Sequence, residues 1–200
     1  MRKTRFVFSI AVAALLVATP AMGQLLNYPI TALPAGDADG ATSIGAGWGR
    51  GLNADSGKLN AFGVGITRAM ETVSFSVAGV YVNSSDIGLG GRLAYNGLAE
   101  NIGIQGGIEW KSPDAGTQLN LPIGISFSGA SESVTYSVMP RVQFTRTSPT
   151  TGDSSTETDF GASAGIGFVT EGGVGLALSG DWVSGTSSIL VGAAVYYQLP

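Results

Sequence analysis

The sequence predicts an all-β fold: an up-and-down antiparallel transmembrane β-barrel of about ten strands, with eight strands as the alternative. Segments with a period of two recur from residue 42 to the C-terminus, with bulky apolar residues on one parity and small or polar residues on the other. Only 12% of the residues are charged, whereas ordinary soluble domains have about 25%. The 31 glycines disfavour helices throughout.

The chain divides into three parts. Residues 1–23 have the features of a secretory signal peptide, with a basic start, an apolar run over 6–17 and small residues before Gln24. An uncleaved anchor is the alternative, but the apolar run is short for a membrane about 30 Å thick. Residues 24–41 form an N-terminal lead segment, expected to be either a periplasmic lead or a plug, and residues 42–200 form the barrel. The signal predicts export to the outer membrane.

The charge after the signal is acidic. Three of the ten basic residues lie in the first 23 positions, so seven remain against 14 acids, and the net charge is −7. This balance gives no support to nucleic-acid binding.

The stretch NIGIQGGIEW, residues 101–110, shows the alternation clearly, with isoleucines and Trp110 on one parity and Gly, Gln and Glu on the other. This period of two predicts a strand with two unlike faces. The predicted strands are 42–48, 60–68, 73–82, 87–95, 100–110, 119–129, 134–146, 160–170, 174–183 and 188–198. Their bulky rows include Ile44 and Trp48; Phe62, Val64 and Ile66; Val73, Phe75, Val77 and Tyr81; Ile102, Ile104 and Ile108; Leu119, Leu121, Ile123, Ile125 and Phe127; Val134, Tyr136, Val138, Val142 and Phe144; Phe160, Ile166 and Phe168; Leu176, Leu178 and Trp182; and Ile189, Val191, Val195 and Tyr197.

The connectors alternate in length along the chain. Those after odd-numbered strands include the longest, and those after even-numbered strands have at most about four residues. The longer connectors are expected at 49–59, 83–86, 111–118, 147–159 and 184–187, and the shorter ones at 69–72, 96–99, 130–133 and 171–173. Long and short connectors therefore lie at opposite ends of an up-and-down meander.

Two architectures accept this alternation. In a soluble barrel or sandwich the bulky row fills the core, whereas in a membrane barrel it faces lipid. The strands average about ten residues, which suits a tilted membrane span of about 9–11, and closure protects strand edges that have few charged gatekeepers. Aromatic residues also gather at both strand ends, as interfacial girdles do. They are Trp48, Tyr81, Trp110, Phe144, Phe160 and Trp182 at one end, and Tyr95, Phe127 and Tyr197 at the other.

These patterns together resemble small bacterial outer-membrane β-barrels, the broad class that includes the OmpA- and OmpX-type barrels. The resemblance covers about 42–200 and implies recognition of the last strand by the barrel-assembly machinery. The C-terminal LVGAAVYYQLP offers Gly192, Val195 and Tyr197 at suitable spacing, but it has Leu190 where a polar residue is usual and continues past the last aromatic residue.

No residue set predicts an enzyme, a cofactor or a metal site. The sequence lacks both His and Cys, so the catalytic histidine common in outer-membrane enzymes of this size is missing. GDSS at 152–155 superficially resembles a serine-hydrolase motif, but without a histidine it is expected to be the tip of the longest loop.

Two sets of charged residues are the candidate sites. Arg92, Glu109, Arg141 and Asp181 have the luminal parity, and because an isolated charge in a narrow barrel is costly, Arg141 is expected to pair with Glu109 or Asp181. A wet lumen that solvates these charges is the alternative. At the long-loop end, the second set shares the parity of the bulky row and is expected either to contact lipid phosphates or to snorkel. This set consists of Arg50, Lys58 and Arg146.

The predicted function is a non-enzymatic integral outer-membrane protein, either a structural barrel or a narrow passive pore. The alternatives are a surface interaction barrel, which binds a ligand through the loop 147–159, and a soluble secreted β-protein. The expected partners are outer-membrane lipid and the barrel-assembly machinery. The sequence leaves the oligomeric state open.

Overall fold

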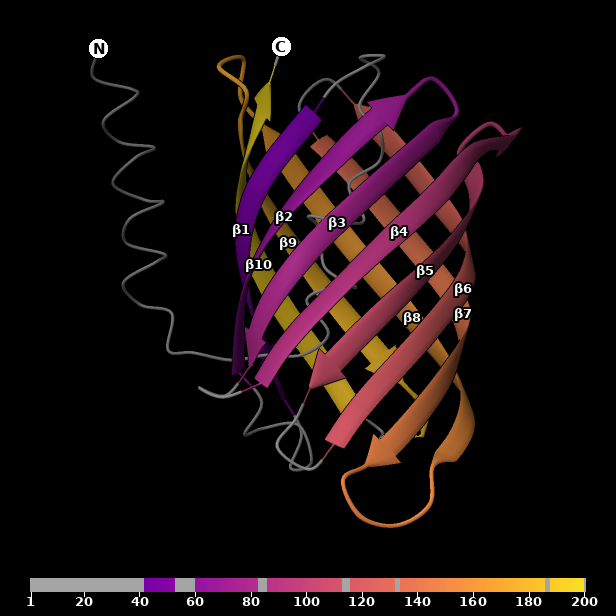
Figure 1. Ribbon diagram of the computed structural model, residues 1–200. Helices are drawn as coiled ribbons and strands as arrows, with labels where there is room; N and C mark the ends of the chain where they lie inside the picture. Colours follow the sequence, from indigo (N-terminus) through magenta and orange to yellow (C-terminus); the bar gives the residue numbers. More distant parts are fainter. Residues whose placement is uncertain are drawn as a thin grey trace.

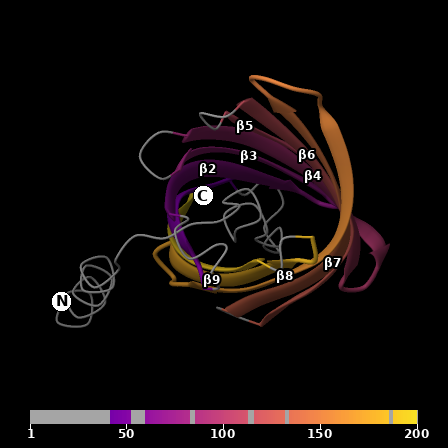
Figure 2. The same ribbon diagram turned by 90° about the horizontal axis from the view of Figure 1, so that it is seen from below.

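The computed structural model describes residues 42–52, 60–82, 86–112, 116–131, 134–185 and 188–199. In this part of the chain ten antiparallel strands form a closed barrel (Figure 1), and the ring of strands is visible along its axis (Figure 2). The predicted fold class is therefore confirmed, with ten strands. They are β1 (Thr42–Gly51), β2 (Asn60–Met70), β3 (Val73–Val82), β4 (Asp86–Ala99), β5 (Ile102–Ser112), β6 (Gly116–Ser131), β7 (Val134–Pro149), β8 (Ser155–Val169), β9 (Val174–Val183) and β10 (Ser188–Leu199).

Each strand pairs with its neighbours in the sequence, and the barrel closes between its first and last strands. Trp48 of β1 lies opposite Phe62 of β2 on one side and Ala193 of β10 on the other. Every strand of this ring therefore has a hydrogen-bonded strand on both sides, which a barrel in a bilayer requires because lipid offers no hydrogen bonds. The predicted signal peptide (1–23) and lead segment (24–41) lie outside the described residues.

The bulky apolar row faces outward. Ile104, Ile123 and Phe127 are 44%, 51% and 47% exposed, whereas luminal Ser126 and Ala177 are buried. A soluble barrel would bury the bulky row in its core, so that alternative is wrong for this fold. The molecule has the sidedness of a transmembrane barrel, with hydrocarbon outside and small or polar groups inside.

Aromatic side chains lie near both rims of this outer surface. At the end of the longer connectors, Phe62 lies opposite both Trp48 and Tyr81, which makes an aromatic row across three strands. At the other end Tyr95 and Tyr197 are exposed. Amphipathic rings in these places suit the two membrane–water interfaces. In the part of the chain described here, no helix is long and apolar enough to cross a membrane.

Several strand boundaries differ from the prediction. β1 extends to Gly51, β4 extends to Ala99 through the predicted connector 96–99, and β6 begins at Gly116 rather than at residue 119. The predicted connector 147–159 is largely a strand extension, because Thr147 pairs with Ser155 and only residues 150–154 join β7 to β8. Its Ser and Thr content suggested a loop, but Thr is β-branched and is a good strand residue. The strand predicted to begin at residue 100 begins at Ile102, because Asn101 has φ 63° in a tight turn, a conformation that Asn tolerates.

Candidate functional site

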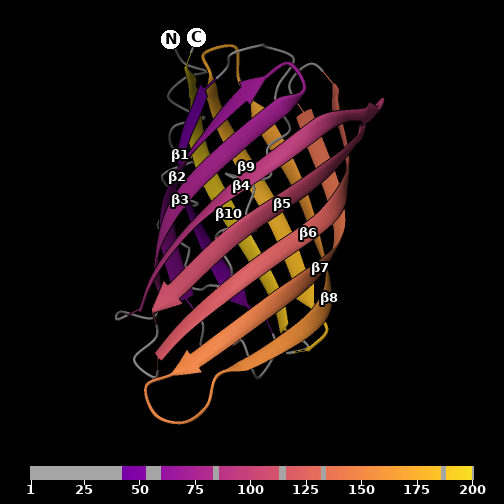
Figure 3. The same ribbon diagram turned by 45° about the vertical axis from the view of Figure 1, so that its right-hand side comes forward.

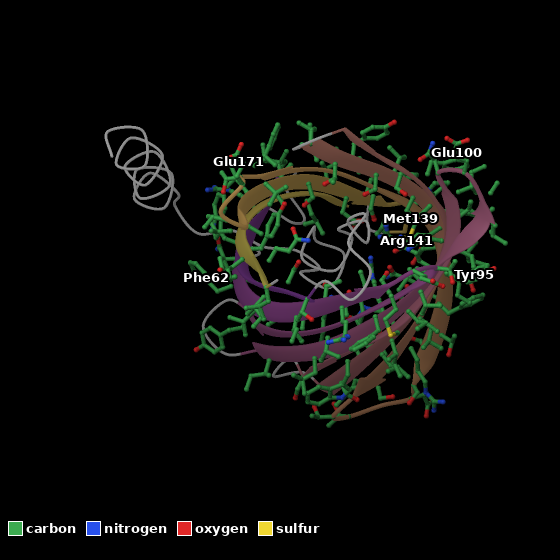
Figure 4. The ribbon with its side chains drawn as sticks, turned by 90° about the horizontal axis from the view of Figure 1, so that it is seen from above. Phe62, Tyr95, Glu100, Met139, Arg141 and Glu171 are labelled. Carbon is green, nitrogen blue, oxygen red and sulfur yellow. The ribbon has the colours of Figure 1, made fainter. Side chains whose placement is uncertain are left out.

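The candidate site is a luminal charge cluster made by Arg92, Glu109, Arg141 and Asp181. These residues lie on the inward rows of β4, β5, β7 and β9, and their exposed fractions range from 0% to 6%. Figure 4 shows Arg141 and Met139 on the inner side of the wall and Phe62 and Tyr95 on its outer side. Strand alternation places the four charges in the lumen, because each neighbouring residue in the strand is directed outward.

Arg141 and Asp181 form the tighter of the two ion pairs. The Arg141 Nη1 and Nη2 atoms donate to Oδ1 and Oδ2 of Asp181 at 2.6 and 2.9 Å. Ser163 of β8 lies between them: its hydroxyl accepts from Arg141 Nη1 at 2.6 Å and donates to Asp181 Oδ1 at 2.6 Å. The fork-to-carboxylate geometry is bidentate, the strong form of this interaction.

The barrel register explains why Arg141 takes Asp181 rather than Glu109. Across β8 to β9, the residue in line with Arg141 is Val183, only two positions from Asp181. Across β6 to β5 the residue in line is Gln105, four positions from Glu109. At about 3.3 Å per residue the two offsets are about 7 and 13 Å, so Asp181 is the nearer carboxylate.

Arg92 and Glu109 form the second pair. The Arg92 Nη2 and Glu109 Oε1 atoms are 3.7 Å apart, and Asn120 Nδ2 donates to Glu109 Oε2 at 3.4 Å. Arg92 lies opposite Gly107, two positions from Glu109. This pair therefore has the same two-residue offset as Arg141 and Asp181, but its members are on adjacent strands. Arg92 also interacts electrostatically with Arg141 and Asp181. The two pairs therefore belong to one cluster without net charge.

Glycines make room for the two arginines on the wall. A Cβ atom at Gly161 would lie 3.1 Å from Arg141 Cζ, and one at Gly124 would lie 2.8 Å from Arg141 Cβ. A Cβ atom at Gly107 would lie 3.0 Å from Arg92 Cγ. These luminal glycines thus let the arginine side chains lie along the barrel wall, a role that the sequence pattern did not assign to them individually.

Ser163 and Asn120 are functional neighbours that the sequence reasoning missed. Asn120 has the luminal parity between the outward residues Leu119 and Leu121, and that parity is the signal that could have identified it. Ser163 lies in the small-residue row of β8, directly opposite Asp181. Only this cross-strand partner distinguishes Ser163 from the other small residues of its row, and the sequence does not provide the register.

The cluster consists of two arginines and two carboxylates, with a serine and an asparagine hydrogen-bonded to the carboxylates. Among the described residues, no group of three or more His, Cys, Asp or Glu could hold a metal ion. The GDSS stretch lies at the β7–β8 connection, where Asp153 and Ser154 are exposed and not on the luminal row of a strand. The two arginines and two carboxylates balance in charge, and loss of one member of a buried pair would leave its partner uncompensated.

The predicted outer-rim residues do not form one group. Arg50 of β1 and Arg146 of β7 are both exposed on the outer surface, but several strands separate them around the ring. Lys58 lies outside the described residues. Contact of these cations with lipid phosphate stays a prediction.

Known proteins are similar to this chain in fold alone. No protein-family model and no curated protein matches it. Among solved structures it is similar to the KdgM porin (TM-score 0.47, 8% identity, 79% of this chain and 99% of that chain) and to the NanC porin (0.46, 10%, 79% and 100%). It is also similar to the N-terminal β-barrel domain of Pseudomonas aeruginosa OprF (0.40, 9%, 80% and 98%). These similarities concern fold alone; the closure and sidedness of the barrel come from its own register and side chains.

Proposed function

We propose that this chain is a non-enzymatic integral outer-membrane protein whose barrel is structural and does not conduct ions at rest. The observation that carries the proposal is the buried Arg141–Asp181 pair, with contacts of 2.6 and 2.9 Å inside the lumen. Paired charges that satisfy each other present little free charge to a passing ion. The second pair, Arg92 and Glu109, lies on β4 and β5 in the same lumen.

The proposed location is the outer membrane, with the short turns on the periplasmic side. The outward apolar surface and the aromatic residues at both rims support insertion in a bilayer. The signal predicted over residues 1–23 supports export, and the barrel-assembly machinery and lipid are the proposed partners. A membrane fraction should retain the protein after a carbonate wash, and its gel mobility should change on heating. Release by the wash would contradict membrane insertion.

Planar-bilayer conductance tests the resting state of the lumen. The wild-type barrel should give no steady ion-scale openings, because the luminal charges are paired. The double substitution Arg141→Ala and Asp181→Ala removes both side chains while keeping the lumen neutral, and it should produce measurable openings. Arg146→Ala removes an exposed cation from the outer surface and serves as the matched control. Steady openings of the wild-type protein would refute the closed state.

A narrow passive pore is the second candidate, and one observation favours it. The luminal Asn120 Oδ1, Gln143 Oε1 and Ser126 Oγ atoms are buried and have no hydrogen-bond partner among the described residues. Buried polar atoms are usually satisfied by protein or by ordered water. A chain of water molecules hydrogen-bonded to these atoms would form a narrow polar passage. The same conductance measurement on the wild-type barrel distinguishes this passage from a closed lumen.

A further inference from the structure

The β7–β8 hairpin leaves one strand edge without a neighbour. β8 pairs with β7 from Ser155 onward, but its pairing with β9 begins only at Gly161. The side of β8 that faces away from β7 therefore has no strand partner from Ser155 to Asp159 in the described part of the chain. This segment, the β8 edge, belongs to the hairpin that projects beyond the barrel rim (Figures 1 and 3).

The hydrogen bonds of Phe160 show which backbone groups the β8 edge presents. The Phe160 N–H donates to Ser184 Oγ at 3.1 Å, and its carbonyl oxygen accepts from the Ser184 N–H at 2.8 Å. Both groups thus point away from β7. Because successive residues of an antiparallel strand point their backbone groups to alternate sides, Thr158 and Thr156 point theirs the same way. The β8 edge presents two N–H donors and two carbonyl acceptors in a row.

The charge around the β8 edge is predominantly negative. Asp153, Glu157 and Asp159 lie in the hairpin beside one cation, Arg146, which is opposite Thr156 and is the last Lys or Arg of the sequence. Side chains at residues 151–158 are exposed. Glu157 and Asp159 share a parity and lie on one face of the strand, so an occupant of the edge would meet carboxylates along one of its faces. A second copy of this edge would bring like charge to like charge and is disfavoured for that reason. A cationic segment is the complementary partner.

We propose that the β8 edge binds an extended segment of a partner polypeptide that carries Lys or Arg side chains. The segment would add as a further strand, with its backbone bonded to Thr156 and Thr158 and its cations near Glu157 and Asp153. Main-chain hydrogen bonds give strand addition its affinity, and side chains give its specificity. The proposal adds a binding surface to the structural barrel, and it is independent of whether the lumen conducts.

Binding of a defined peptide to the full-length barrel in micelles tests the proposal. The probe is a short fluorescent peptide in which Lys and Thr alternate, and its anisotropy reports binding. Thr158→Pro removes an N–H that points to the occupant and spares the bonds to β7, so the affinity should fall by about tenfold or more. Thr158→Val keeps this N–H and should bind as the wild type does. Glu157→Gln should weaken binding by about two- to fivefold and reduce its salt dependence.

Two further probes separate backbone pairing from simple charge attraction. The same peptide methylated on alternate backbone nitrogens keeps its cations but loses its strand donors, and it should not bind. If Thr158→Pro fails to fold, as unchanged gel mobility on heating would reveal, this methylated peptide tests the same bonds on the wild-type barrel. The proposal is overturned if the wild-type barrel does not bind the probe, or if the methylated peptide binds equally well. If the peptide does not bind but the conductance of the barrel is as expected, the binding proposal for the β8 edge fails and the proposed function of the barrel stands.

Discussion

Arg141→Ala should destabilise the barrel strongly, because it leaves a buried carboxylate without its cation. The Arg141 and Asp181 side chains are 0% and 4% exposed, and two short hydrogen bonds join them. Removing one member of such a pair costs about 3–5 kcal/mol, since among the described residues only Ser163 then remains to donate to Asp181. Urea unfolding of the refolded barrel in micelles, followed by tryptophan fluorescence, measures this change in the free energy of unfolding.

A double-mutant cycle separates the pair from general loss of packing. Arg141→Ala with Asp181→Ala should cost less than the sum of the two single substitutions, with a coupling energy of about 1–3 kcal/mol. The exposed Arg146→Ala is the matched control and should leave the unfolding curve unchanged. If Arg141→Ala and Arg146→Ala have the same free energy of unfolding, or if the coupling energy is zero, water in the lumen screens the charges and the Arg141–Asp181 pair does not stabilise the barrel.

Three further outcomes are expected. Gly161→Ala should lower the free energy of unfolding by about 1–3 kcal/mol in the urea assay, because its Cβ would lie 2.7 Å from the Trp182 carbonyl oxygen. Gly180→Ala is the control and should be close to neutral, because the nearest atom to its Cβ would be 3.9 Å away. Asn101→Ala should cost about 1–2 kcal/mol by that assay, because φ is 63°, and Asn101→Gly should not. Arg146→Glu should increase the detergent sensitivity of cells if this cation meets lipid phosphate, while Arg68→Glu at the opposite rim should not; equal sensitivity would exclude the phosphate contact.

The sequence predicts the outer surface of this barrel well because one physical rule controls it. A residue that faces lipid has only to be apolar, so a period of two is enough to assign Ile104 or Ile123 to the outside, and the structure leaves both exposed. The number of strands follows from the same alternation. Boundaries are harder, since the Thr-rich extension of β7 and β8 satisfies both a loop composition and a strand preference.

The luminal contacts could not be predicted as closely, because they depend on register as well as on parity. Counting along each strand from its short turn puts Glu109, Arg141 and Asp181 at similar heights. The register instead offsets Arg141 by two positions from Asp181 and by four from Glu109, and the stagger between neighbouring strands sets these offsets. The alternation along each strand identifies the charged residues that face the lumen, and the stagger between strands determines which of them are in contact.

The two surfaces therefore constrain the sequence in different ways. A fluid bilayer adapts to the shape of an outward side chain, so Ile, Leu, Val or Phe can replace one another there at small cost. The wall inside has fixed neighbours, because a Cβ atom at Gly124 or Gly161 would lie 2.8 or 3.1 Å from a carbon of Arg141, closer than ordinary van der Waals contact. It follows that substitutions between residues of similar polarity should be tolerated outside and not inside. Substituting all amino acids at Ile123 and at Gly124, adjacent positions of one strand, and scoring folding by heat-modifiable gel mobility tests this. Equal tolerance at both positions would mean that the lumen is loosely filled and that the arginine side chains do not need the space left by the glycines.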